Sequence, residues 1–160
     1  MINSRKGFSM VVAIFTIILM SIVASYIFYA SGTISKEGAI QYKREQAMLL
    51  ARSYTEYAVM AIAANNRDVA CLNEINATAL GSNPSIGNGY DINVKISYIG
   101  NAKYIASPPK DCARVVAQLQ NPPNDPDALS VILDVYVKYK DSANQNEPWQ
   151  TYHRRSLQKI

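Results

Sequence analysis

The residues with the greatest chemical potential in this 160-residue sequence are two cysteines and one histidine. Cys71 and Cys112 are too few for a zinc site made of cysteine or for a disulfide-rich scaffold. Joined to each other, they would close a loop of about 40 residues and contribute on the order of 4 kcal/mol of stability, if loop entropy dominates. The alternatives are two free buried thiols, or a catalytic cysteine with His153 as its partner. We expect the disulfide, because this part of the chain is expected to be exported to an oxidising compartment.

A second candidate is an oxygen-rich loop. Asn124, Asp125 and Asp127 offer ligands of the type that bind Ca²⁺. They lack the repeating pattern of a calcium loop, and turn formation explains an Asn-Asp-Pro sequence equally well. His153 is a lone histidine in an expected strand and has no partner that would favour catalysis. We therefore expect no metal, no cofactor and no enzymatic activity.

Two surface motifs complete the polar candidates. Glu74-Ile75-Asn76-Ala77-Thr78 contains an N-x-T acceptor with an acidic residue two positions before the Asn, which is similar to the bacterial N-glycan acceptor. The C-terminal segment is basic, and its charged residues are His153, Arg154, Arg155 and Lys159. It could contact DNA, anionic lipid or a partner, but a solvated strand face is the simpler interpretation. The formal charge of +4 is too small to indicate nucleic acid by itself.

A long apolar run near the start of the chain is expected to determine where the rest of the chain is located. Only four residues between Phe8 and Ala30 are not apolar, namely Ser9, Thr16, Ser21 and Ser25. As a helix the run would measure about 34 Å, enough to cross a hydrocarbon core of ~30 Å. Arg5 and Lys6 precede it, so the N-terminus should stay in the cytoplasm and the rest of the chain should be exported.

The helix is expected to continue past the apolar run. No proline occurs before Pro84, and residues 39–64 are mostly good helix formers. Seven of these residues recur at helical spacing and predict a core-facing stripe, namely Ala47, Leu50, Ala51, Tyr54, Ala58, Ala61 and Ile62. Asn65-Asn66 marks the expected end. The sequence thus predicts one long helix, wholly apolar in its first half and amphipathic in its second.

The junction from Ser4 to Met10 (SRKGFSM) resembles the processing site of type IV prepilins and type II secretion pseudopilins. In that family a membrane peptidase cuts after the Gly and methylates the new N-terminal Phe, which here implies cleavage between Gly7 and Phe8. The resemblance extends to the change of pattern along the helix. It implies a leader at 1–7, a transmembrane helix at 8–30, its amphipathic continuation at 31–64, and a periplasmic sheet domain at 65–160.

The sequence departs from the family at one position of the helix. Most major pilins carry Glu as the fifth residue of the mature chain, where it is thought to pair with the N-terminal amine of a neighbouring subunit. Counting from Phe8, the fifth residue is Val12. A charge in lipid is costly unless it is paired, so the Glu drives docking and Val12 removes that drive. Within the family this resembles a minor, priming or accessory subunit.

Beyond residue 80 the composition changes to turn and strand formers. Alternating apolar residues predict half-buried strands at Tyr90–Tyr98 and Leu129–Lys140, and Trp149–Leu157 is expected as a third. Residues 81–89 are expected to form a loop. Gly100-Asn101 suits a hairpin turn, with a short returning strand at 102–106. The expected fold is α+β, with the long N-terminal helix packed on a small antiparallel sheet of three to four strands.

These expectations describe a minor pilin or pseudopilin that helps to initiate or assemble a type IV pilus or a type II secretion pseudopilus. Its partners would be other pilin or pseudopilin subunits, the prepilin peptidase and the inner-membrane assembly platform, with nucleic acid not expected. It would cross the bacterial inner membrane once and carry its C-terminal domain in the periplasm. Two alternatives remain, a signal-anchored periplasmic binding domain outside any filament and a secreted protein cleaved after Ala30-Ser31-Gly32.

Overall fold

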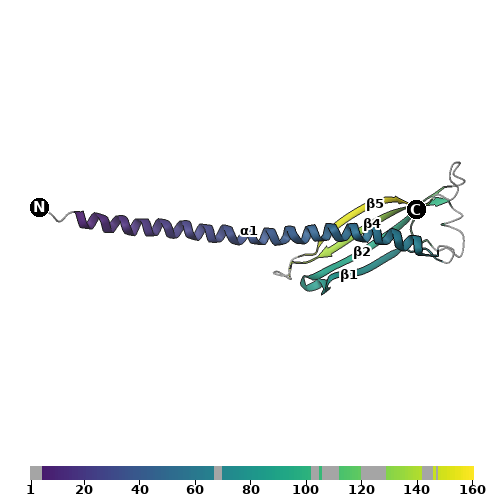
Figure 1. Ribbon diagram of the computed structural model, residues 1–160, viewed down its shortest axis with the longest axis horizontal. Coiled ribbons are helices and arrows are strands. Elements are labelled where there is room, and N and C mark those ends of the chain that lie inside the picture. Colours follow the sequence, from purple (N-terminus) through teal and green to yellow (C-terminus); the bar gives the residue numbers. More distant parts are fainter. Residues whose placement is uncertain are drawn as a thin grey trace. The chain divides into compact units, whose positions relative to one another are not determined.

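The described residues form one long helix and a five-stranded sheet. The computed structural model describes residues 5–66, 70–101, 105, 112–119, 129–141, 146 and 148–160. The elements in chain order are α1 (Arg5–Ala64), β1 (Glu74–Asn83), the short 3₁₀ helix η1 (Pro84–Ile86), β2 (Asn88–Asn101), β3 (Val115–Leu119), β4 (Leu129–Tyr139) and β5 (Gln150–Lys159) (Figure 1). The chain divides into two compact units between Tyr42 and Lys43.

The first unit contains the N-terminal part of α1. Its large apolar side chains are exposed, as at Met20, Phe28 and Tyr29, which are 77, 80 and 75% accessible. By length and composition this helix can cross a membrane, and a signal sequence at the start of a chain meets the same criterion. No proline interrupts it, and Gly32 and Gly38 lie within it.

The second unit begins at Lys43 and holds the rest of α1 and the whole sheet. The strand order is β1-β2-β4-β5, with antiparallel pairing throughout this path, and β3 pairs in parallel with β2. The second half of α1 lies across one face of the sheet (Figure 1). The expected α+β architecture is confirmed, with five strands in place of three to four.

The core lies between this half of α1 and the facing side of the sheet. Strands β2 and β4 alternate buried and half-buried residues as predicted, so that each contributes one continuous apolar face. Four helix residues are fully buried against them, namely Ala47, Ala51, Ala58 and Ile62. Three of the four are alanines, and side chains this small allow the helix backbone to approach the sheet closely. The remaining positions of the predicted stripe, Leu50, Tyr54 and Ala61, are half-buried.

The first strand corrects one sequence-based expectation. β1 covers Glu74–Asn83, so it includes the start of the segment expected to be a loop. A β-bulge between Ala79 and Asn83 bends its end, and Gly81 there has φ +149°. A Cβ on Gly81 would lie 2.6 Å from the Asn88 carbonyl oxygen, so only glycine fits this close approach between strands.

The expected hairpin turn at Gly100-Asn101 is wrong. Both residues belong to β2, where Gly100 pairs with Leu129 of β4 and with Gln118 of β3. Pairing on both sides holds this end of the strand extended and overrides the local turn preference. Most of the expected returning strand at 102–106 lies outside the described residues, and Ile105, which is described, is helical. The expected ends of the other elements hold to within a few residues.

Candidate functional site

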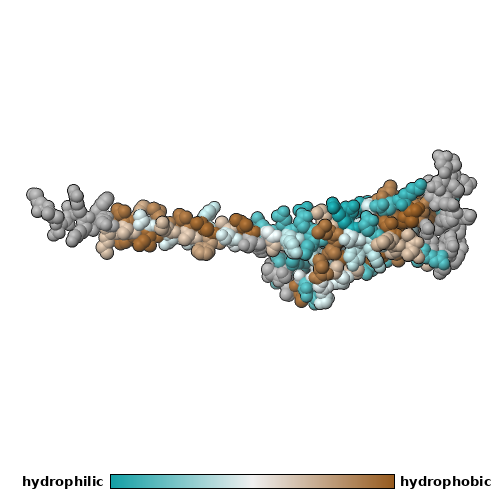
Figure 2. All heavy atoms as spheres, in the orientation of Figure 1, coloured by the Kyte–Doolittle hydropathy of each residue, from teal (hydrophilic) through white to brown (hydrophobic). Residues whose placement is uncertain are grey.

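The apolar segment of α1, Met10–Ala30, exposes large hydrophobic side chains along its whole length. Figure 2 shows apolar residues along this part of the helix. Its polar side chains satisfy their own hydrogen bonds. The hydroxyls of Thr16, Ser21 and Ser25 donate to the carbonyl oxygens of Ala13, Ile17 and Ser21, over 2.9, 2.8 and 2.8 Å. The hydroxyl donors of these three residues are therefore satisfied within the helix, which lowers the cost of placing them in lipid.

One side of the apolar segment carries a shallow depression. It is lined by Ile17, Ile18, Ser21, Ile22 and Ser25. Ser21 and Ser25 are one helical turn apart, and small residues at that spacing allow two helices to approach closely within a membrane. The segment can thus serve both as an anchor and as a surface for packing against another helix.

The predicted processing residues lie at the start of α1. Gly7 and Phe8 fall within its first turn, because the helix begins at Arg5. Val12 follows one turn later and is 45% accessible. The residue is part of the exposed apolar surface of this helix.

The two cysteines form the predicted disulfide. Cys71 and Cys112 are bonded, with their Cα atoms 4.9 Å apart and 41 positions apart in sequence. Cys71 lies three residues before β1 and Cys112 lies three residues before β3. The bond therefore joins the entries to two strands that pair with the same edge of β2, β1 along its first part and β3 at its end. Such a bond indicates an oxidising compartment.

A cluster of charged residues occupies the outer face of the sheet, defined here as the face opposite α1. The cross-strand register places four residues of alternating charge in one row from β1 to β5, namely Glu74, Lys95, Asp134 and Arg155. Opposite charges at directly paired positions stabilise a sheet. The row therefore stabilises the pairing of β1, β2, β4 and β5 on the face opposite α1.

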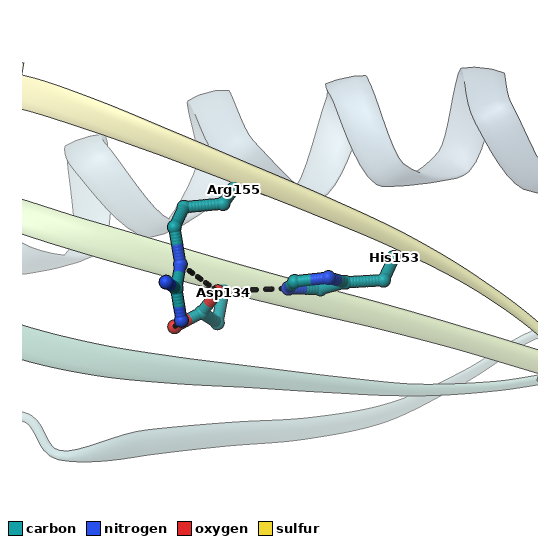
Figure 3. Close-up of polar contacts among 3 residues, drawn as sticks. All are labelled: Asp134, His153 and Arg155. Atoms are coloured by element: carbon teal, nitrogen blue, oxygen red, sulfur yellow. Dashed lines mark hydrogen bonds and ion pairs between the residues drawn. The ribbon is translucent and has the colours of Figure 1, made fainter.

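Asp134 is the centre of this cluster and is 8% accessible (Figure 3). Its carboxylate accepts hydrogen bonds from Arg155 Nε and Nη2 at 2.7 and 2.9 Å, and it lies 2.8 Å from His153 Nε2. The hydrogen bonds from Arg155, followed by that to His153, lower the pKa of Asp134, although partial burial opposes the shift. The same bond raises the pKa of Arg155.

His153 belongs to this cluster through its contacts with Asp134 and Tyr136. Its ring stacks on Tyr136, with centroids 4.4 Å apart and planes 11° apart. Lys95 Nζ lies 5.4 Å from the centre of the same tyrosine ring. An Asp–His pair can activate a nucleophile, but the His153 ring interacts with Asp134 and Tyr136, which are not nucleophiles in this arrangement. The cluster can orient strands and present a rigid polar surface.

The C-terminal basic segment does not form one patch. Because side chains alternate along a strand, His153, Arg155 and Lys159 lie on the outer face while Arg154 lies on the helix side. Arg155 is also neutralised by Asp134. The described part of the chain contains no group of three or more His, Cys, Asp or Glu residues that could hold a metal ion. The loop with Asn124, Asp125 and Asp127 lies outside the described residues.

Sequence reasoning missed an apolar groove beside β1. It has a volume of about 280 Å³ and is lined by Ser53, Tyr54 and Tyr57 of α1 and by Ile75, Asn76 and Ala77 of β1. Its two tyrosine rings meet edge to face, 5.9 Å apart. The groove exists because β1 lies at the edge of the sheet and carries small residues toward the helix. No local signal predicts it without knowledge of β1.

Comparison with protein-family models, with curated proteins and with solved structures found no match. The architecture itself is pilin-like: a long N-terminal helix that is apolar near its start and packs, in its later part, on an antiparallel sheet.

Proposed function

We propose that this protein is a pilin-like structural subunit, either a minor pilin of a type IV pilus or a pseudopilin of a type II secretion system. One observation carries the proposal. The apolar segment of α1 and the amphipathic stretch that packs on the sheet belong to one uninterrupted helix, Arg5–Ala64. A plain membrane anchor needs only the first of these, and a soluble domain needs only the second.

Assembly would occur through the apolar segment. Its large side chains are exposed, and Ser21 and Ser25 give it a surface suited to helix packing. Such a helix is stable in lipid and is equally stable when surrounded by the same helix of other subunits. The partners in this proposal are therefore other pilin or pseudopilin subunits, with the prepilin peptidase and an inner-membrane platform acting on the subunit before assembly.

The proposal assigns the protein a minor or initiating position. Val12 stands where a bulk subunit would carry a carboxylate to pair with the N-terminal amine of its neighbour. Without that pair the helix gains no electrostatic drive to join beneath an existing subunit. A subunit that begins an assembly has no need of this drive.

The mature N-terminus tests the proposal against its two alternatives. Mass spectrometry of the protein purified from its own cells should find N-methylated Phe8 as the first residue. An intact Met1 would indicate a signal-anchored binding domain, for which the groove beside β1 offers a binding surface. A chain that starts at Thr33 would indicate a secreted protein. Either of these two results would overturn the filament proposal.

A further inference from the structure

The segment Glu74–Thr78 carries a modification motif that filament assembly does not explain. It is the only N-x-S/T sequence in the chain whose middle residue is not proline, because the other, Asn83-Pro84-Ser85, is blocked by Pro84. The segment forms the start of β1. Side chains two positions apart in a strand share a face, so Glu74, Asn76 and Thr78 project together from the outer face. All three are exposed.

Hydrogen bonding fixes the orientation of the Asn76 amide. Asn93, paired with Asn76 across β1 and β2, donates from Nδ2 to Glu74 Oε1 and to Asn76 Oδ1. A carboxylate can only accept, so the atom of Asn93 that faces Glu74 must be its nitrogen. The atom of Asn76 that faces this same nitrogen must then be its oxygen. The amide nitrogen of Asn76 is thereby directed away from the Asn93 donor.

The position of β1 makes the motif accessible to an enzyme. Among the described strands, β1 pairs only with β2, so its other edge is open. The side chains that hold the start of β1 to the core are Ile75, Ala77 and Ala79, and all three are only half-buried. Segments with few buried apolar contacts open locally at lower free energy than the rest of a domain. The disulfide of Cys71 with Cys112 lies just before this strand and indicates the compartment where N-glycans are transferred.

We propose that Asn76 is an N-glycosylation site, with Glu74 and Thr78 as the flanking residues that the transferase recognises. The donor would be a lipid-linked glycosyl pyrophosphate. Asn76 Nδ2 attacks the anomeric carbon of the first sugar, and the new N–C bond forms as the C–O bond to the pyrophosphate breaks. The lipid pyrophosphate leaves with the electron pair, and the amide loses one proton to a base of the transferase. The reaction requires export of the sheet domain and does not require a filament.

The test is peptide mapping of the full-length protein purified from its own cells. After reduction and alkylation of the disulfide, trypsin should release residues 68–95 as one peptide, which contains both Asn76 and Asn83. Fragmentation should place a glycan on Asn76 and none on Asn83. Asn76→Gln and Thr78→Ala should remove the whole glycan mass, and Thr78→Ser should retain it. An unmodified Asn76 in the native protein would overturn the proposal, as would a glycan that survives Thr78→Ala.

The role of Glu74 needs a matched pair of variants. Glu74→Gln should reduce glycan occupancy strongly if the transferase reads the carboxylate. Asn93→Ala removes the hydrogen bonds that Glu74 and Asn76 receive but leaves the motif intact, so occupancy should stay at the native level. An equal loss of glycan occupancy in Glu74→Gln and Asn93→Ala would show that the geometry of the strand controls the modification. It would also show that the transferase does not recognise the Glu74 carboxylate. Retention of the Cys71–Cys112 disulfide, measured by thiol alkylation, confirms that each variant has folded.

Discussion

Asp134 of β4 and Arg155 of β5 form a two-point contact, with both oxygens of the carboxylate bonded to one guanidinium. The pair lies on the outer face of the sheet at directly opposed positions. It ties β5 to the centre of the sheet on the face opposite α1.

This contact predicts a pH-dependent stability. Asp134→Asn should lower the free energy of unfolding at neutral pH by about 1–2 kcal/mol, because charged hydrogen bonds are lost while the exposed Arg155 remains screened by solvent. The pKa of Asp134 is lower in the folded state than its ordinary 3.8, so its contribution is complete above that value. It is lost as the pH falls through the folded pKa. Urea unfolding in detergent should therefore separate the native and variant curves at neutral pH and bring them together in acid.

Asp91→Asn is the matched control for this prediction. Asp91 lies on the same face, on β2, directly opposite Lys138. No salt bridge to Asp91 is found among the described residues, so Asp91→Asn should alter the free energy of unfolding by less than about 0.5 kcal/mol. An equal effect of both substitutions would show that general surface charge, and not the Arg155 contact, sets the stability.

The disulfide predicts a second stability effect. Cys71→Ser should lower the free energy of unfolding by roughly 2–4 kcal/mol, because the loop of about 40 residues is no longer closed in the unfolded chain. Thermal unfolding followed by circular dichroism would measure the loss. Cys112→Ser should give a similar loss, and the double variant should cost little more than either single one. Two freely alkylated thiols in protein purified without reductant would contradict the assignment.

The elements that the sequence predicted well share a strong periodicity of apolar residues. In β2 and β4 the apolar faces consist of large residues in long unbroken alternation, such as Tyr90–Tyr98, so the periodicity is strong. The second half of α1 is equally clear, since its stripe is spaced for a helix. β1 was missed because two of its three inward residues near its start are Ala77 and Ala79. Alanine has weak strand propensity, and only the pairing with β2 makes this segment a strand.

The pairing of distant strands was beyond local reasoning. β2 is central because β1, β3 and β4 all pair with it, and one of these contacts joins Tyr98 to Val131. Nothing in either segment specifies that register. The cluster around Asp134 could not be predicted for the same reason. The position of Asp134 in its strand shows only that it faces outward. Its contact with Arg155 follows from the register of β4 with β5. The cysteine pair was predictable because two cysteines allow a single pairing.

Processing predicts a sharp effect at Gly7. In the prepilin family the peptidase needs a small residue before the cleaved bond, so Gly7→Glu should leave the protein in the membrane at precursor size. Gly7→Ala is the control of similar size and should be cleaved. Cleavage removes Arg5 and Lys6, so gel mobility and intact mass both report it. Normal maturation of Gly7→Glu would count strongly against the prepilin assignment.

Val12 provides the test of the subunit's position in an assembly. Val12→Ala should be mild, because only a few methyl contacts are lost at a residue that is 45% accessible. Val12→Arg should be severe, since a guanidinium at that depth of the membrane costs about 3 kcal/mol or more. Val12→Ala measures the effect of side-chain size, and Val12→Arg measures the effect of an unpaired charge. Filament number and the amount of this protein in sheared filaments would be measured for both.

Val12→Glu is the discriminating variant. In a bulk-type subunit the new carboxylate would pair with the N-terminal amine of a neighbour, and incorporation would rise. In an initiating subunit no such amine lies within reach, so the carboxylate stays unpaired in lipid and incorporation should be unchanged or reduced. We expect the second result, with filament number falling toward that of Val12→Arg. If Val12→Glu instead raised the protein to the abundance of a major subunit, the assignment to a minor position would be wrong, while assembly through α1 would stand.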